Sequence, residues 1–263
     1  MAGKALKFLK IAKHNDLAQL DMPETTIRHS HIIQQKLFLK NLYVDFYCRF
    51  KKAIGNPENK CLVELGSGGG FIKEIIPNVI TSDVIKVPGV DMIFSAEQMP
   101  FENESVDAFF MFDVLHHIPN PRLFFKEAVR CLKIGGEIVM IEPANTLWGR
   151  FIYKNFHHEA FDENAGWQME STGPLSCANG AVPWIIFNRD RKIFENEFPN
   201  LKILKIAPHT PLRYLISGGL TLRQLLPGFC YSLIAAIEWL LSPANGLLGM
   251  FQAIELEKIY EKK

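Results

Sequence analysis

The sequence predicts an α/β fold in which a mainly parallel sheet is covered by helices on both faces. From residue 61 onward, short apolar runs alternate with helical stretches. These runs are continuous instead of alternating with polar residues, which is typical of strands buried on both faces. The 263 residues, 48% hydrophobic and 22% charged, suffice for one large domain or two small ones with a sizeable core.

The expected elements follow in order along the chain. A long helix is expected at 30–54, where apolar residues recur at helical spacing until the GNPENK segment ends it. Apolar runs predict strands at 61–65, 79–83, 91–95, 106–115, 135–143, 201–206 and 250–259. Helical patterns predict further helices at 71–76, 121–133, 189–199 and 229–242.

Charge and cysteine usage argue against several classes of function. The net charge of +1 gives no overall field that would favour nucleic acid. The five cysteines form no CxxC pair, which argues against zinc and redox sites and favours a reduced, cytoplasmic setting. The lysine-rich N-terminus lacks the unbroken apolar core of a secretory signal. A solvated helix is expected there, with a weak membrane-surface anchor as the alternative.

The segment CLVELGSGGGFIKEI, residues 61–75, places four glycines between a strand and a helical stretch. Glycine lets a ligand approach the main chain, and a helix N-terminus offers free N–H groups, so a nucleotide-like ligand is expected. A phosphate-binding loop would need GK[ST], and a dinucleotide site would need glycine where Phe71 stands. The remaining pattern is ExGxGxG, formed by Glu64, Gly66, Gly68 and Gly70. Its acid would repel a pyrophosphate and suits a ligand that carries an ammonium group.

Taken together, these segments resemble the class I S-adenosylmethionine-dependent methyltransferases. VELGSGGG is similar to the first motif of that family, and TSD at 81–83 lies where its second strand ends in an acid. Residues 95–121 resemble the stretch that cups the adenine and forms the fourth strand. FKEAVRCLKIGGEIVMIEP resembles the fifth helix–strand unit, so the likeness covers about 60–143. The later segments resemble a methyltransferase-11-type bacterial subgroup of unassigned substrate.

The resemblance implies a Rossmann-like, doubly wound, seven-stranded sheet, mostly parallel with the last strand antiparallel, plus helical insertions. It implies a single methyltransferase domain over 1–263. The expected parts are an N-terminal helical extension over the active site at 1–55, a cofactor-binding core at 56–143, a substrate lid insertion and helix at 144–200, and the last two strands at 201–263 with an apolar helical insertion at 208–247.

The resemblance also implies S-adenosylmethionine as the cofactor and S-adenosylhomocysteine as the product. Glu64 would face the methionine ammonium group, Asp83 would accept from the ribose hydroxyls and Asp113 would border the methyl group. The implied cofactor-binding residues are Glu64, Gly66, Ser67, Gly68, Gly70, Asp83, Val84, Ser95, Ala96, Glu97 and Asp113. Ser95 stands where the family often has Asp, so a weaker bond to the adenine amino group is expected. Asp113 could instead cap the next helix.

The catalytic candidates are His117 and His158, which would take a proton if the acceptor is a hydroxyl, with Glu159 and His209 as further candidates. No metal is expected, because adjacent side chains such as those of His116 and His117 point to different faces of a helix or strand. One of the two is expected to pack inside and the other to face the cleft.

The acceptor is expected beside the methyl group, above the fourth and fifth strands, and could be a small molecule, a saccharide or a lipid-linked compound. Residues 144–185 are irregular and rich in aromatic and titratable residues, as in a binding lid or a surface loop. From 225 to 253 the only charged residue is Glu238. Each apolar piece is too short to span a bilayer, and packing in the core is expected for this helix. An apolar wall for a lipid-like acceptor, or peripheral membrane contact through 225–251, is the alternative.

Two other function classes remain open from the sequence. A protein that binds S-adenosylmethionine without catalysis would keep the same glycine loop and would differ in turnover alone. A nicotinamide-dependent reductase is disfavoured by the missing sixth-position glycine.

Overall fold

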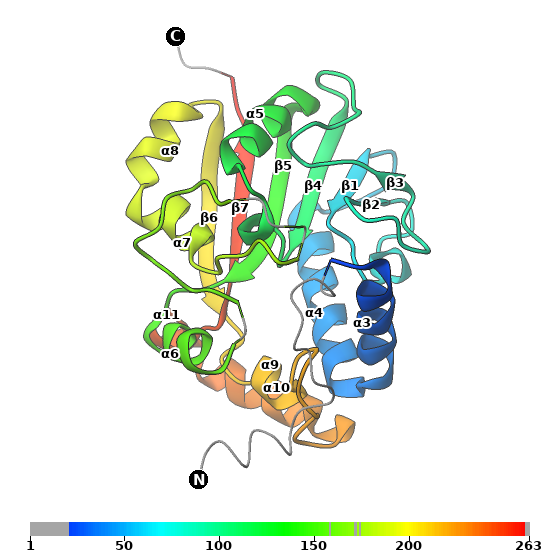
Figure 1. Ribbon diagram of the computed structural model, residues 1–263, viewed down its shortest axis with the longest axis vertical. Helices are drawn as coiled ribbons and strands as arrows, with labels where there is room; N and C mark the ends of the chain where they lie inside the picture. The colour runs from blue at the N-terminus through cyan, green and yellow to red at the C-terminus, as the bar shows by residue number, and fades with distance from the viewer. Residues whose placement is uncertain (1–20, 158, 171–172, 174, 261–263) are drawn as a thin grey trace.

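A seven-stranded sheet forms the centre of the computed structural model, which describes residues 21–157, 159–170, 173 and 175–260. The strand order is β3-β2-β1-β4-β5-β7-β6 (Figure 1). The strands are β1 (Leu62–Leu65), β2 (Ile80–Asp83), β3 (Met92–Ile93), β4 (Val106–Phe112), β5 (Leu132–Pro143), β6 (Leu201–His209) and β7 (Phe251–Lys258). β7 runs antiparallel to both of its neighbours, and the other pairs are parallel. The predicted mostly parallel sheet with an antiparallel last strand is therefore confirmed.

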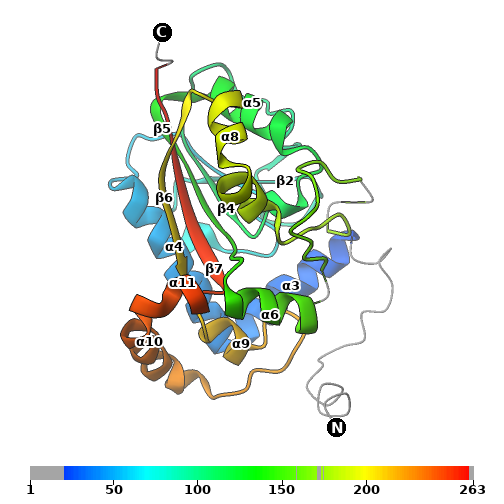
Figure 2. The ribbon, with the colours of Figure 1, turned by 90° about the vertical axis from the view of Figure 1, so that its left-hand side faces the viewer.

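Helices cover both faces of the sheet, as the apolar strands require. α4 (Leu37–Ile54) lies on one face, while α5 (Pro121–Cys131) and α8 (Arg191–Glu197) lie on the other (Figure 2). Phe50 of α4 stacks on Phe110 of β4 with ring centroids 5.1 Å apart. On the opposite face, Phe125 of α5 meets Phe194 of α8 edge to face at 5.1 Å. These aromatic contacts are part of the core on the two faces of the sheet.

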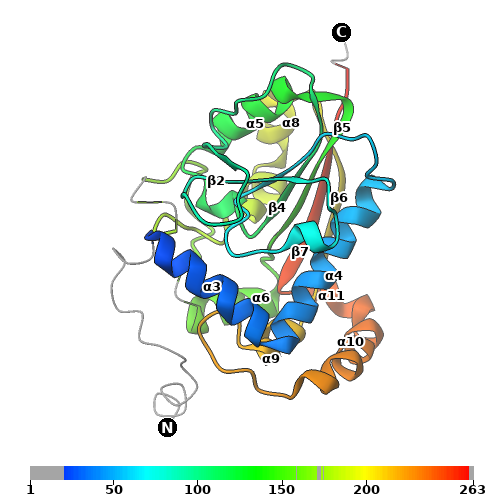
Figure 3. The same cartoon turned by 90° about the vertical axis from the view of Figure 1, so that its right-hand side faces the viewer.

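The predicted single helix at 30–54 is wrong, because the chain forms two helices, α3 (Pro23–Gln35) and α4, that break at Lys36. The ammonium group of Lys36 donates to the backbone carbonyls of Gly219 and Leu222. The backbone N–H of Phe38 donates to the side chain of Gln224 at 3.0 Å. Hydrogen bonds to residues 219–224 thus stabilise the break between the two helices. As a result, α3 lies across the end of the sheet (Figure 3). The lysine-rich segment expected to be helical lies in residues 1–20, outside the described residues.

The shorter helices gather in two places. Near the sheet lie the 3₁₀ turns η1 (Ile72–Glu74) and η2 (Leu115–His117), with α7 (Val182–Trp184) and the π-helical turn η3 (Ile185–Arg189) before α8. Beyond the carboxyl end of β5 lie α6 (Leu147–Phe156), α9 (Arg213–Ser217), η4 (Gly228–Cys230), α10 (Tyr231–Leu240), η5 (Ser242–Ala244) and α11 (Asn245–Leu248) (Figure 1). Among the described residues, none of the helices combines the length and hydropathy that a bilayer span needs.

Two expectations about the later part of the chain are corrected. Residues 144–185 are not only irregular, because α6 forms there and Tyr153, Phe161 and Trp167 are buried in the core. Only one side of α10 packs in the core: Tyr231 and Ile234 are buried, whereas Trp239 is 74% exposed and Leu240 69% exposed. Composition shows that a helix is apolar, but it does not show which side of that helix the rest of the fold covers.

Candidate functional site

A cavity of about 850 Å³ lies at the carboxyl ends of β1, β2 and β4, at the point where the strand order reverses. The structure brings the predicted cofactor residues together on its wall: Glu64, Gly66, Ser67, Gly68, Gly70, Asp83, Val84, Ser95, Ala96, Glu97 and Asp113. Of the two catalytic candidates, His117 lines the same cavity, while His158 lies outside the described residues. The volume is in the range of sites for ligands of cofactor size.

The glycine loop is a tight turn pressed against the N-terminal helices. Gly66 has a φ of +64°, a conformation that residues with a Cβ rarely adopt. A Cβ added at Gly70 would lie 2.3 Å from the hydroxyl oxygen of Tyr47 in α4. These glycines therefore allow a sharp turn and close packing of α4, and the cavity side of the loop presents main chain to a ligand.

Asp83, the last residue of β2, joins the glycine loop to the second strand. Its Oδ2 accepts from the backbone N–H of Gly68 at 2.9 Å, and its Oδ1 accepts from the N–H of Ile85 at 2.9 Å. Each carboxylate oxygen has a second lone pair, so the group can still accept hydrogen bonds from a ligand in the cavity.

Glu64 carries a buried acid at the centre of the cavity wall. The residue is 2% exposed, and its Oε2 makes no hydrogen bond to any described residue. Burial raises the pKa of Glu64 to about 7; the nearby Asp83 adds to the rise and the Ser67 hydroxyl opposes it. A carboxylate that is desolvated and only partly satisfied is well suited to receive a cationic group.

The side chains at the expected adenine end are already engaged within the chain. Ser95 accepts from the backbone N–H of Glu97 at 3.1 Å, and Glu97 accepts from the N–H of Asn120 at 2.7 Å. Both residues fix loop geometry, which leaves the backbone around Ala96 for contact with a base.

A dense polar cluster closes the far end of the cavity. Glu142, at the end of β5, accepts from the N–H groups of Val114 and Leu115 with one carboxylate oxygen, at 2.9 and 2.7 Å. Its other oxygen meets Nδ1 of His116 at 2.7 Å. Glu142 therefore fixes both the backbone after β4 and the ring of His116.

His116 and His117 do not point to different faces, contrary to the expectation that argued against a metal. Their ring centroids lie 4.4 Å apart, and Nε2 of each ring faces Glu159. Nε2 of His116 is 3.5 Å from Glu159, and Nε2 of His117 is 3.6 Å from the other oxygen of the same carboxylate. As expected, one ring is fully buried, that of His116, and the other borders the cavity.

The charges in this cluster shift one another's pKa values. Burial alone would lower the pKa of His116, but Glu142, Glu159 and Asp113 raise it well above its usual value. Burial, together with the charge of His116, lowers the pKa of His117 to about 4. Burial raises the pKa of Asp113 to about 7; His116 opposes the rise, and Glu159 and Glu142 add to it.

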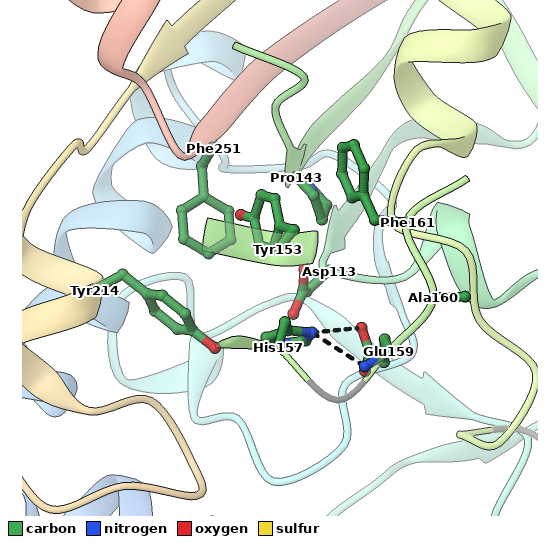
Figure 4. A pocket seen from close by; sticks show the side chains of 10 residues that line it. Asp113, Pro143, Tyr153, His157, Glu159, Ala160, Phe161, Tyr214 and Phe251 are labelled. Atoms are coloured by element: carbon green, nitrogen blue, oxygen red, sulfur yellow. Dashed lines mark hydrogen bonds and ion pairs between the residues drawn. The ribbon is translucent and has the colours of Figure 1, made fainter. Parts of the chain in front are cut away.

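A second, smaller cavity adjoins the first and shares Asp113, His157 and Glu159 with it. Nδ1 of His157 lies 3.6 Å from the Glu159 carboxylate (Figure 4). The rest of its wall is mainly apolar and aromatic, from Pro143, Tyr153, Ala160, Phe161, Gly180, Tyr214 and Phe251. With an accessible volume of about 10 Å³, this second cavity has room for about one water molecule next to Asp113.

Sequence reasoning missed several residues of the site. Tyr43 and Tyr47 of α4, and Thr26 and His29 of α3, line the cavity from above, and helical periodicity alone did not identify them. Glu142 carried a signal that could have been used, since it is an acid inside an otherwise apolar strand. The candidate His209 lines neither cavity; it is buried against Phe46 and Phe251 and pairs with Thr210.

Comparisons with known proteins agree with this geometry. Residues 63–140 match the family model described as a methyltransferase domain. Over 52 residues the chain is 42% identical to the sarcosine/dimethylglycine N-methyltransferase of Aphanothece halophytica, a stretch covering 20% of this chain and 19% of that protein. The match thus spans about a fifth of the curated relative's length.

Solved structures match the chain at low identity. A chain of the complex formed by the Haloferax volcanii Trm112 methyltransferase activator matches with a TM-score of 0.50 and 9% identity, over 95% of this chain and 100% of that one. The geranyl diphosphate C-methyltransferase of Streptomyces coelicolor matches with a TM-score of 0.49 and 15% identity, over 84% and 78% of the two chains. Over residues 63–140 the chain therefore matches a methyltransferase domain, and its sheet and glycine loop have the form that the resemblance to the class I S-adenosylmethionine-dependent methyltransferases implies.

Proposed function

We propose that this protein transfers the methyl group of S-adenosylmethionine to a small-molecule acceptor. The observation that carries the proposal is the line of groups along one cavity wall, from Asp83 past the glycine loop and Glu64 to Asp113. Asp83 would accept from the ribose hydroxyls, and Glu64 would pair with the methionine ammonium group. Asp113 would then border the sulfonium methyl, next to the second cavity.

The chemistry is an in-line displacement at the methyl carbon. A bond forms from the acceptor atom to carbon as the carbon–sulfur bond breaks, and its electron pair stays on sulfur to give S-adenosylhomocysteine. The electrophile is already activated, so alignment is the main contribution of the protein, worth up to about 7–11 kcal/mol. The acceptor would occupy the part of the large cavity beside Asp113, with its apolar part against Phe156, Leu220 and Leu222.

Asp83→Ala is expected to weaken S-adenosylmethionine binding by about tenfold or more, because a charge-assisted bond to the ribose contributes about 1.5–3 kcal/mol. Isothermal titration calorimetry measures the change, with Asp91→Ala as the control. Asp91 is an acid of the same region that lines neither cavity and pairs with Lys73. Equal affinities of wild type and Asp83→Ala would remove Asp83 from the site.

Turnover separates catalysis from binding. Release of S-adenosylhomocysteine in the presence of fractionated small-molecule extracts, followed by mass spectrometry, is the direct assay. Tight binding of S-adenosylmethionine with no product in any fraction would favour a binding protein without catalysis.

We further propose that the apolar end of the molecule contacts a membrane surface, from which a lipid-like acceptor could enter. In support, Phe229, Leu233, Trp239 and Leu240 are 85%, 63%, 74% and 69% exposed. The one charged residue between 225 and 253, Glu238, is buried and paired with Arg213. An uncharged surface with an exposed tryptophan fits the boundary between lipid headgroups and acyl chains. Leu220 and Leu222, just before this end, line the large cavity.

Vesicle flotation tests this contact. Wild type is expected to float with vesicles of phosphatidylethanolamine and phosphatidylglycerol, and Trp239→Ser with Leu240→Ser is expected to reduce binding about fivefold or more through lost apolar burial. Ile193→Ser is the matched control, since Ile193 is an exposed apolar residue on α8 at 46% exposure. Absence of wild-type binding, equal binding of all variants, or a stable dimer through this end would contradict the proposal.

A further inference from the structure

The two imidazoles of η2 are held in the same way. Nδ1 of His116 is hydrogen-bonded to the Glu142 carboxylate at 2.7 Å, and Nδ1 of His117 is hydrogen-bonded to the backbone carbonyl of Cys177 at 3.0 Å. In each ring Nε2 is left to face Glu159. Histidines that bind metals characteristically place their second nitrogen on a carboxylate or a backbone carbonyl in this manner, because that bond fixes the tautomer and the ring orientation.

The side chains of His116, His117 and Glu159 bring three potential metal-ligand atoms close together. The ligating atoms of His116, His117 and Glu159 lie within 4.8 Å of one another, with nitrogen–oxygen separations of 3.5 and 3.6 Å. Ligands about 2.1 Å from one ion are about 3.0–3.4 Å apart in octahedral or tetrahedral geometry, so small side-chain movements suffice. Nε2 of His116 is fully buried and makes no hydrogen bond within the part of the chain that the structure describes.

We propose that His116, His117 and Glu159 bind one divalent transition-metal ion, with Asp113 as a further carboxylate beside it. Two imidazoles and one carboxylate suit Mn²⁺, Fe²⁺, Co²⁺ or Zn²⁺ better than the hard, oxygen-seeking Ca²⁺ or Mg²⁺. Glu142 and the Cys177 carbonyl act as orienting groups behind the two histidines.

The charge of the cluster favours a cation. Asp113, Glu142 and Glu159 approach the single ring of His116 at 4.0, 2.7 and 3.5 Å. Three carboxyl groups therefore surround one buried ring, and these oxygen-rich surroundings favour a bound cation over an anion or a neutral ligand.

The site lies at the junction of the two cavities, because Glu159 and Asp113 line both. The ion would therefore have protein on the His116 side and open space on the cavity side, where an oxygen or nitrogen of an acceptor could become a ligand. Metal affinity can be measured without any cofactor, so failure of this inference is distinguishable from failure of the proposed methyl transfer.

The experiment uses the full chain with no affinity tag, stripped with a chelator and dialysed against Mn²⁺, Fe²⁺, Co²⁺ and Zn²⁺ in turn. Elemental analysis is expected to give about one ion per chain, and Co²⁺ is expected to show the visible absorption of nitrogen ligation. His117→Ala and Glu159→Gln each remove one ligand, and we expect each to weaken binding by about 100-fold or more. Glu142→Gln removes only an orienting carboxylate, and a loss of about 10–100-fold is expected.

His31→Ala serves as the control, because His31 is an exposed histidine of α3 that is remote in sequence from the cluster. Its affinity is expected to equal that of wild type. Circular dichroism of the stripped variants checks folding, and the cavity-wall variant His117→Ala keeps the test valid if substitutions at buried Glu142 unfold the chain. Binding well below one equivalent, or an affinity unchanged in His117→Ala and Glu159→Gln, would show that the cluster is an ion-pair network only.

Discussion

Glu64→Gln is expected to weaken S-adenosylmethionine binding and, at the same time, to stabilise the ligand-free protein. The substitution removes the acid that would face the ammonium group of the ligand, and charge-assisted bonds are worth about 1.5–3 kcal/mol, or about 10–100-fold in affinity. It also removes a buried carboxylate whose Oε2 makes no hydrogen bond to the described residues. Affinity and stability should therefore move in opposite directions.

The stability gain depends on pH with a definite sign. Burial raises the folded-state pKa of Glu64 to about 7 from the usual 4.5, so the wild-type carboxyl is protonated in the folded protein at low pH. The contribution of the Glu64 carboxyl to the free energy of unfolding is fully present below pH 4.5 and is lost as the pH rises through 7. At pH 8.5 the Gln variant should be more stable than wild type by about 3 kcal/mol, and at pH 5 by much less.

Urea unfolding at both pH values and calorimetry with S-adenosylmethionine measure the two effects. Glu74→Gln is the matched control, because Glu74 is an exposed acid just past the same loop and should change neither quantity. A Glu64→Gln variant with full affinity would place the ammonium group elsewhere in the cavity. An unchanged difference in stability between pH 5 and 8.5 would show that Glu64 is ionised throughout.

Glu238→Gln is expected to destabilise the protein by about 3 kcal/mol, because breaking a buried ion pair leaves its partner charge without full compensation. One oxygen of Glu238 accepts from the N–H groups of Leu212 and Arg213 at 2.8 and 2.7 Å, and the other meets the Arg213 guanidinium. Arg213 also contacts Asp45 and Tyr231, so this one acid of α10 joins the exposed helix to α9 and α4.

Urea unfolding at neutral pH measures this loss. Trp239→Ser, the next residue along the same helix, is the control, and its change should stay within about 0.5 kcal/mol because the side chain is largely in solvent. If Glu238→Gln proves as stable as Trp239→Ser, then Asp45 alone neutralises Arg213, and α10 is held by its apolar contacts.

Patterns confined to short stretches of sequence were readable. The parallel strands followed from continuous apolar runs. Glu64 was proposed because an acid beside a glycine loop limits the ligands that fit, and Asp83 was proposed from the family resemblance; both line the large cavity. The break at Lys36 could not be predicted from local sequence, because it depends on the carbonyls of Gly219 and Leu222, about 180 residues away. The pairing of His116 with Glu142 was missed for the same reason, because strand pairing sets that contact and local spacing does not. The exposure of α10 depends on which face the fold leaves open.

The ammonium group of Lys36 ties the bend between α3 and α4 to the carbonyls of Gly219 and Leu222. Thr26 and Ile33 of α3 line the cavity, and so do Leu220 and Leu222. Lys36, together with the bond from Phe38 to Gln224, thus connects segments on both sides of the cavity. When a ligand displaces residues 219–222, α3 is expected to move with them, so that ligand entry and closure over the ligand are coupled.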